Sequence, residues 1–125
     1  MLTLPALLRR SVRLFGDRTA IMDPQGRWTW REFSGRVGRA AAVLKSLGVS
    51  KGQRFGILCR NGYRNTELMQ AGYWLGAVPV PINYRLAPPE IAYILNDADC
   101  RVVAVEDSFL ELMRSAELKA WSDRL

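Results

Sequence analysis

The stretch RFGILCRNGYRNTELMQAGYWLGAVPVPI, residues 54–82, predicts a strand, a helix and a second strand in succession. Its first part, Arg54–Cys59, is an apolar run of strand length. The middle predicts a helix that Asn61 caps and Gly76 ends. Its apolar stripe consists of Leu68, Ala71, Gly72 and Leu75. Two strands separated by one helix in this way are expected to be parallel and joined by a right-handed crossover.

The second strand of this unit, Val78–Ile82, contains two prolines. Pro79 and Pro81 have no backbone N–H to donate to a ladder. The strand is therefore expected at an edge of the sheet, or paired on one side only.

Downstream of this unit the alternation continues. The stretch Ala87-Pro88-Pro89-Glu90 predicts a helix start, because proline is tolerated in the first turn and glutamate favours the positive end of the helix dipole. Arg101–Val105 predicts the next strand. The apolar positions of the helix before this strand are Ile91, Ile94 and Leu95. A last helix is predicted after the strand, with apolar positions Phe109, Leu112, Met113 and Ala116.

Upstream, Thr19–Met22 and Arg27–Thr29 predict two short strands around a Pro- and Gly-containing turn, Asp23–Gly26. Thr29 and Glu32 have the spacing of a capping box, in which each side chain accepts from the other residue's backbone N–H. The helix behind this box has an apolar stripe and is expected to end at Gly48; the stripe consists of Phe33, Val37, Ala40, Leu44 and Leu47. The fold class predicted for the whole chain is α/β, with strands alternating with helices in a mostly parallel sheet.

Residues 1–16 contain Arg9, Arg10 and Arg13 and no acidic residue. Such a composition is also found in mitochondrial transit peptides. The alternative is an ordinary first helix of the domain, capped by Thr3 and ended by Gly16, because its leucines recur at helical spacing. This helical pattern favours the second interpretation.

Composition excludes several classes of protein. The 125 residues are 49% apolar and 24% charged, which is typical of one globular domain or of a piece of a larger protein. No apolar run approaches the roughly 18 residues that cross a bilayer, so no transmembrane segment is expected. Histidine is absent, which removes the commonest general base and metal ligand. Cys59 and Cys100 are expected to be reduced, small apolar core residues rather than a disulfide, which favours a cytoplasmic location.

The net charge of +6 suggests a basic nucleic-acid-binding domain as one alternative. However, the arginines are spread over several predicted elements instead of lying together among aromatic residues. Solvated helix faces therefore explain this charge better, and no nucleic-acid partner is expected.

Recognisable catalytic motifs are missing from the chain. It has neither a GxGxxG nor a GxxxxGK[ST] sequence, and its serines have no histidine to activate them. Two close carboxylate pairs, Asp97 with Asp99 and Glu106 with Asp107, are more typical of solvated element ends than of an acid/base site. Neither catalytic nor metal-ligating residues are predicted, which indicates a scaffold, an interaction module or a fragment.

Three stretches resemble the start of the adenylate-forming enzymes, the AMP-binding superfamily that includes acyl-CoA synthetases. Residues 16–20, GDRTA, are similar to the family's "PDRPA", and residues 28–33, WTWREF, to its "LTYxEL". Residues 74–83, WLGAVPVPIN, are similar to its "LKAGAxxVPLN". The resemblance runs from Leu2 to about Val105 and implies that residues 1–125 are the N-terminal part of the large AMP-binding domain, with Met1 as a natural start. It also implies that the rest of that domain and the small C-terminal domain are absent.

The stretch Asn83-Tyr84-Arg85-Leu86 resembles the "NPRL" of the acyl-CoA synthetases, with tyrosine in place of proline. This resemblance implies an ATP-dependent ligase that joins a fatty or aromatic carboxylic acid to CoA through an acyl-adenylate. It also implies that Mg²⁺ supports the first step by neutralising phosphate charge. It also implies that Arg85 can contact a CoA phosphate; the alternatives are a solvated loop residue or a partner for Glu90. The family's ATP-binding residues and its catalytic lysine have no counterpart here, so the fragment is expected to be inactive and to bind none of these cofactors. A non-catalytic α/β interaction module is a further alternative.

Overall fold

The computed structural model describes residues 3–125, so the expected natural start at Met1 lies outside the described residues. In chain order the elements are α1 (Leu4–Phe15), β1 (Thr19–Asp23), β2 (Gly26–Thr29), α2 (Trp30–Ser46), β3 (Arg54–Leu58), α3 (Tyr63–Leu75), β4 (Val78–Pro81), α4 (Pro88–Asp97), β5 (Val103–Val105), the 3₁₀ helix η1 (Asp107–Arg114) and α5 (Ala116–Asp123).

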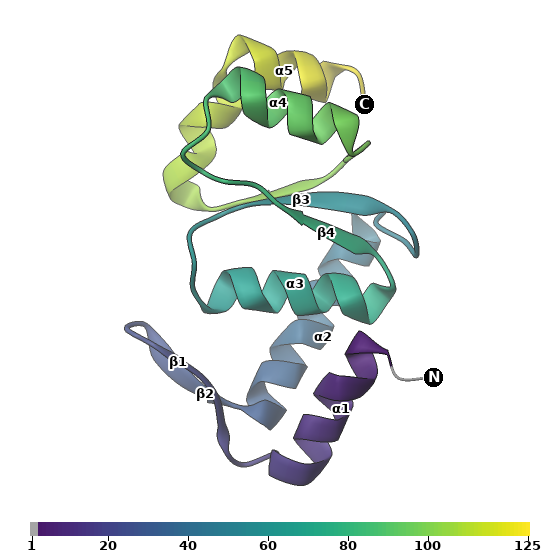
Figure 1. Cartoon of the computed structure of the whole chain (residues 1–125), viewed down its shortest axis with the longest axis vertical. Coiled ribbons are helices and arrows are strands. Elements are labelled where there is room, and N and C mark those ends of the chain that lie inside the picture. The colour runs from purple at the N-terminus through teal and green to yellow at the C-terminus, as the bar shows by residue number, and fades with distance from the viewer. Residues whose placement is uncertain (1–2) are drawn as a thin grey trace.

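A three-stranded parallel sheet lies at the centre of the fold. Its strand order is β4-β3-β5, and β3 pairs with both neighbours in parallel. Strands β1 and β2 form a separate antiparallel hairpin. Helix α3 lies on one side of the sheet, nearer to α1 and α2, and helices α4 and α5 lie on the other side (Figure 1). The predicted α/β class with a parallel sheet is confirmed.

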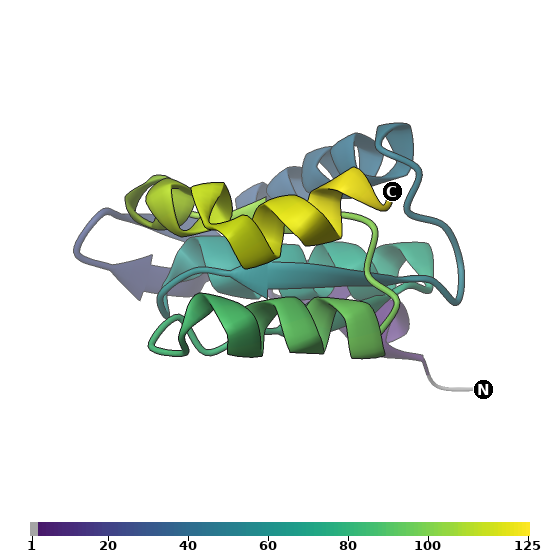
Figure 2. The ribbon, with the colours of Figure 1, turned by 90° about the horizontal axis from the view of Figure 1, so that it is seen from above.

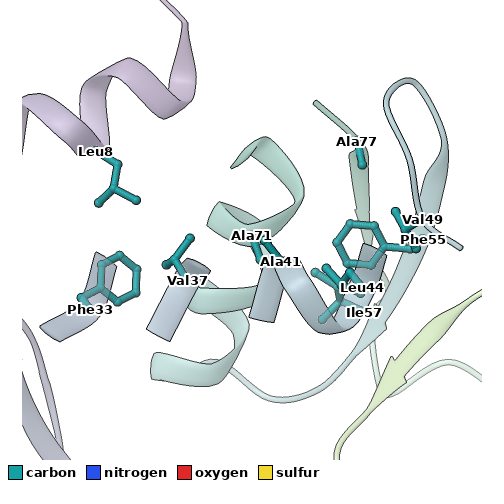
Figure 3. Packing of buried hydrophobic residues seen from close by; sticks show 10 residues of the cluster. All are labelled: Leu8, Phe33, Val37, Ala41, Leu44, Val49, Phe55, Ile57, Ala71 and Ala77. Carbon is teal, nitrogen blue, oxygen red and sulfur yellow. The ribbon is translucent and has the colours of Figure 1, made fainter. Parts of the chain in front are cut away.

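Successive side chains of β3 point to opposite faces of the sheet. Phe55 and Ile57 belong to the core that faces α1, α2 and α3, whose ten buried side chains are shown in Figure 3. Leu58 belongs to the second core, under α4 and α5. Figure 2 shows α4 and α5 as neighbouring helices in front of the sheet. Because both faces are covered, β3 is apolar and buried from Phe55 to Leu58 instead of alternating with polar residues.

The capping box of α2 is present as predicted. Thr29 Oγ1 accepts from the Glu32 amide at 3.1 Å, and Glu32 Oε1 accepts from the Thr29 amide at 3.1 Å. Residues 4–15 form the expected first helix, with Thr3 as its cap and with Leu8 buried. Strand β4 lies at one edge of the described sheet, as its prolines indicated.

Three local expectations are wrong. Asn61 does not cap α3, whose N-cap is Gly62 and which has no side-chain cap of its own. The strand expected from Arg101 is regular only over Val103–Val105. The single helix expected around Phe109–Ala116 is instead η1 followed by a separate helix, α5.

Helix α5 packs on α4 through residues that the sequence patterns did not indicate. Leu118 and Trp121 of α5 are buried, and Trp121 Nε1 donates to the carbonyl of Cys100 at 3.1 Å. Their spacing of three residues is the helical signal that could have revealed them. Among residues 3–125, the helices are all too short or too polar to cross a membrane.

Candidate functional site

The connections that leave the central strands go to opposite sides of the sheet. Strand β3 leads into α3 on one face, whereas β5 leads through η1 to α5 on the other (Figure 1). In open parallel sheets such a reversal leaves a crevice beyond the carboxyl ends of the two strands, where ligands commonly bind. A cavity of about 630 Å³ lies at this position, lined by residues that follow β3, by residues that follow β5 and by the tip of the β1-β2 hairpin.

The hairpin wall of this crevice is attached to the start of α3. Asp23 Oδ2 accepts a hydrogen bond from the Tyr63 amide at 3.2 Å, and Asp23 Oδ1 accepts from the Gln25 amide at 2.8 Å. Asp23 therefore supplies the acceptor that Gly62, with no side chain, cannot supply to α3.

An aromatic stack fixes the same junction from the side. The rings of Trp28 and Tyr63 are stacked with their centroids 4.3 Å apart. The guanidinium of Arg36 lies 5.6 Å from the Trp28 ring centroid and 5.3 Å from that of Tyr63. Arg36 Nε also donates to Glu67 Oε2 at 2.7 Å in a half-buried ion pair. These contacts join the hairpin, α2 and α3.

The opposite wall is formed where β3 and β5 end. Glu106 Oε2 accepts from the Arg60 amide at 2.8 Å, which ties the two strand ends together. The Arg60 guanidinium lies 5.5 Å from the ring centroid of Phe109. Arg60 is exposed, and none of the ion pairs within residues 3–125 includes it.

Arg85, the one site residue selected from the sequence, lies in the loop after β4, at the same carboxyl edge of the sheet. Its amide donates to Asn83 Oδ1 at 2.9 Å, and its guanidinium lies 5.7 Å from the ring centroid of Tyr84. Tyr84 stacks in turn on Phe109, with centroids 5.1 Å apart. Tyr84 and Phe109 therefore connect the Arg85 loop with the wall that carries Arg60.

The side chain of Arg85 is exposed and is absent from the ion pairs of residues 3–125. Glu90, its suggested partner, instead accepts from the Ala87 amide at 3.3 Å at the start of α4. The interpretation of Arg85 as a partner of Glu90 therefore finds no support in the geometry, and the guanidinium is available to a ligand.

The remaining polar candidates do not form a site. Asp97 and Asp99 are exposed, and residues 3–125 hold no cluster of three or more acidic, cysteine or histidine side chains that could bind a metal. Both cysteines are free. Burial raises the pKa of the Cys59 thiol, with the Glu106 carboxylate adding to the effect, and burial likewise raises the pKa of Cys100. Thiols with raised pKa values are poor nucleophiles at neutral pH.

Comparison with known proteins identifies the family. A model of the AMP-binding enzyme family matches residues 8–124, and the chain belongs to this family. The long-chain-fatty-acid–CoA ligase FadD13 of Mycobacterium tuberculosis is 42% identical over 99 residues, covering 78% of this chain and 20% of that protein. The 4-hydroxybutyrate–CoA ligase 2 of Metallosphaera sedula is 34% identical over 110 residues, covering 88% of this chain and 20% of that protein. The chain thus spans about a fifth of the length of these relatives.

Solved structures agree with this assignment. The N-terminal domain of FACL13 from Mycobacterium tuberculosis superposes with a TM-score of 0.90 at 30% identity, covering 97% of this chain and 32% of that chain. The anthranilate–CoA ligase AuaEII superposes with a TM-score of 0.91 at 30% identity, covering 99% of this chain and 24% of that chain. The chain is homologous to the N-terminal region of acyl-CoA ligases, and the alternatives of an interaction module and a nucleic-acid-binding domain receive no support.

Proposed function

We propose that this chain is the N-terminal part of an ATP-dependent acyl-CoA ligase that acts on a fatty or aromatic carboxylic acid. The observation that carries the proposal is the family match across residues 8–124, together with relatives that are CoA ligases of both kinds. In the reaction, the substrate carboxylate attacks the α-phosphate of ATP and forms an acyl-adenylate with loss of pyrophosphate. The CoA thiol then displaces AMP and forms the thioester.

Residues 3–125 contribute the scaffold and one edge of the ligand site rather than the reacting groups. The side chains that hold the triphosphate belong to later parts of the ligase, and the carboxylates described above do not gather into a Mg²⁺ site. We assign no chemical step to Mg²⁺ on these residues. The two free cysteines fit a reducing compartment, so we propose a cytoplasmic location.

Arg85 is the residue that we assign to CoA. A guanidinium presents a fork of N–H donors that matches phosphate oxygens. The turn made by Asn83 and the ring of Tyr84 hold the Arg85 loop at the carboxyl edge of the sheet, and the exposed guanidinium remains free to bind. We propose that it contacts a phosphate at the nucleotide end of CoA.

The test compares the isolated chain with a full-length ligase that contains these residues. The full-length protein is expected to catalyse ATP–pyrophosphate exchange that depends on an added acid such as palmitate or benzoate, and to form the CoA thioester. The isolated chain is expected to show neither activity above a heat-denatured control. Exchange by the isolated chain, or a full-length protein inactive with both classes of acid, would refute the proposal. Salt-sensitive retention of random DNA would instead support the nucleic-acid-binding alternative.

A further inference from the structure

We infer that Tyr84 and Phe109 are positioning residues for CoA: their rings, stacked across the end of β3, hold the turn that presents Arg85. The inference rests on the proposed function, because it starts from the contact between Arg85 and a CoA phosphate. Neither ring is assigned a contact with CoA itself. The conformation of the turn, the attachment of Phe109 and the exposure of Arg85 support it in three steps.

Residues 83–86 form a tight turn shortly after β4. The Leu86 amide donates to the Asn83 carbonyl at 3.2 Å, and the Arg85 amide donates to Asn83 Oδ1 at 2.9 Å. Among residues 3–125, Asp99 is the one non-glycine residue with a positive φ. Tyr84 and Arg85 therefore lack the left-handed conformation that the type II, I′ and II′ turns require, and the turn is of type I.

Tyr84 occupies the second position of this turn, where proline is favoured because its ring presets φ. A tyrosine leaves φ free, so the backbone must be restrained in another way. Within residues 3–125 the Tyr84 amide makes no backbone hydrogen bond. The side chain supplies the restraint instead, since the Tyr84 ring stacks on Phe109 with an angle of 20° between the ring planes.

Phe109 is attached to the ends of the two other strands. It lies in η1, and its amide donates to the Glu106 carbonyl at 2.9 Å. The Glu106 amide donates in turn to the Leu58 carbonyl at the end of β3, at 3.0 Å. Because the strand order is β4-β3-β5, the stack reaches from the loop after β4 across the end of β3 to the segment after β5. The turn is thus anchored to the whole carboxyl edge of the sheet.

The two rings are half-buried, whereas Arg85 is exposed. Tyr84 and Phe109 both pack against the core under α4 and α5. The Tyr84 ring therefore contacts the anchored ring of Phe109 and also the guanidinium of Arg85. A side chain and loop that are ordered before binding lose less conformational freedom when they bind a phosphate. Loss of the stack should weaken the contact between Arg85 and CoA without removing it.

Kinetics of the full-length ligase test the inference. Tyr84→Leu and Phe109→Leu, which keep an apolar side chain, should each raise KM for CoA about two- to tenfold, the factor that corresponds to the energy of an aromatic pair. Acid-dependent pyrophosphate exchange should stay the same, since CoA takes no part in it. Tyr93→Leu is the matched control, because Tyr93 of α4 is 70% exposed and belongs to none of the aromatic pairs within residues 3–125.

An unchanged KM for CoA in Tyr84→Leu or in Phe109→Leu would overturn the inference. Equal losses in adenylation and in thioester formation would also overturn it, because they would show that the stack supports only the fold. The double variant with both leucines should be no worse than either single variant, since both changes remove the same contact. Effects that multiply in the double variant would show two independent roles.

Tyr84→Pro distinguishes restraint of the turn from a general loss of packing. Proline restrains φ at this position and removes no backbone hydrogen bond of the described residues, so KM for CoA should stay within about twofold of the wild type. In this background Phe109→Leu should have no further effect. A KM for Tyr84→Pro as high as that for Tyr84→Leu would refute the restraint by the turn.

The outcomes separate this inference from the proposed function. A wild type without acid-dependent pyrophosphate exchange would refute the proposed function, and calorimetric titration of CoA into the same variants then decides the positioning role by itself. An active ligase in which Arg85→Ala raises KM for CoA and Tyr84→Leu does not would refute the positioning role alone. An unchanged KM in Arg85→Ala would refute both the assigned phosphate contact and the positioning role.

Discussion

The carboxylate of Asp23 accepts a hydrogen bond from the amide of Tyr63 at 3.2 Å, across a separation of 40 residues in the chain. Asp23 ends β1, and Tyr63 begins α3. The hairpin therefore caps a helix whose own N-cap is a glycine. This contact also sets one wall of the crevice beyond the carboxyl ends of β3 and β5.

Removing this cap should weaken the fold. We expect Asp23→Ala to lower the free energy of unfolding by about 0.5–2 kcal/mol, the range found for lost helix caps. Asp23→Asn, which keeps an acceptor oxygen, should lose less. Asp17→Ala is the matched control, because its side chain is 96% exposed and its contact with Arg31 is a surface ion pair. Urea denaturation of the four proteins measures the difference, and an equal effect of Asp17→Ala and Asp23→Ala would contradict the capping role.

This contact also shows what the sequence could reveal and what it could not. The capping box of Thr29 and Glu32 was predictable because both partners lie within one helical turn. The cap of α3 was not, because Asn61 is the nearer candidate and only the folded chain brings Asp23 to Tyr63.

The same distinction applies to the candidate site. The parallel orientation of the strands was predictable from local patterns, and Arg85 from a resemblance. Arg60 and Glu106 became candidates only when the strand order β4-β3-β5 placed the ends of β3 and β5 beside each other. The strand order depends on packing between distant segments, which single-sequence patterns do not encode.

The capping box of α2 should make stability depend on pH. Hydrogen bonds from the backbone amide and then the side chain of Thr29 lower the pKa of Glu32 from its usual 4.5. A carboxyl whose pKa is lower in the folded state adds stability above its unfolded pKa, and this stability is lost as the pH falls through the folded value. Glu32→Gln should therefore lose less stability than the wild type when the pH is lowered from about 6 to about 3. Urea denaturation at several pH values measures the free energy of unfolding of both proteins. An equal loss in the two proteins over this pH range would show that the hydrogen bond between Glu32 and Thr29 is not formed.

Two glycines in helices should respond oppositely to alanine. A Cβ at Gly72 of α3 would lie 2.8 Å from Phe55 Cε1 and 3.1 Å from Pro79 Cδ, inside the core between helix and sheet. We expect Gly72→Ala to cost about 1–3 kcal/mol through overpacking. At Gly35 of α2 the nearest atom to a new Cβ is the mobile end of Arg39 at 3.5 Å, so Gly35→Ala should stabilise the chain by about 0.5–1 kcal/mol. Thermal unfolding of both variants measures the contrast, and a stabilising Gly72→Ala would mean that α3 lies farther from β3 and β4.

The last prediction concerns Arg85 in the full-length ligase that we propose. If its guanidinium contacts a CoA phosphate, Arg85→Ala removes a charge-assisted hydrogen bond worth about 1.5–3 kcal/mol. This corresponds to a loss of roughly tenfold to somewhat more than 100-fold in apparent CoA affinity. Adenylation should be nearly unchanged, because CoA takes no part in that step. Arg101→Ala is the control, since Arg101 is an exposed arginine near the opposite, amino end of the sheet.

The two half-reactions are compared by pyrophosphate exchange and by thioester formation at varied CoA. Equal losses in both would show that Arg85 supports the fold, and no loss in either would show that it is a solvated loop residue. Only a rise in KM confined to CoA supports the contact. Dephospho-CoA then tests which phosphate is bound. If Arg85 binds the 3′-phosphate, the wild type should bind dephospho-CoA more weakly than CoA, while Arg85→Ala should discriminate little between these two ligands.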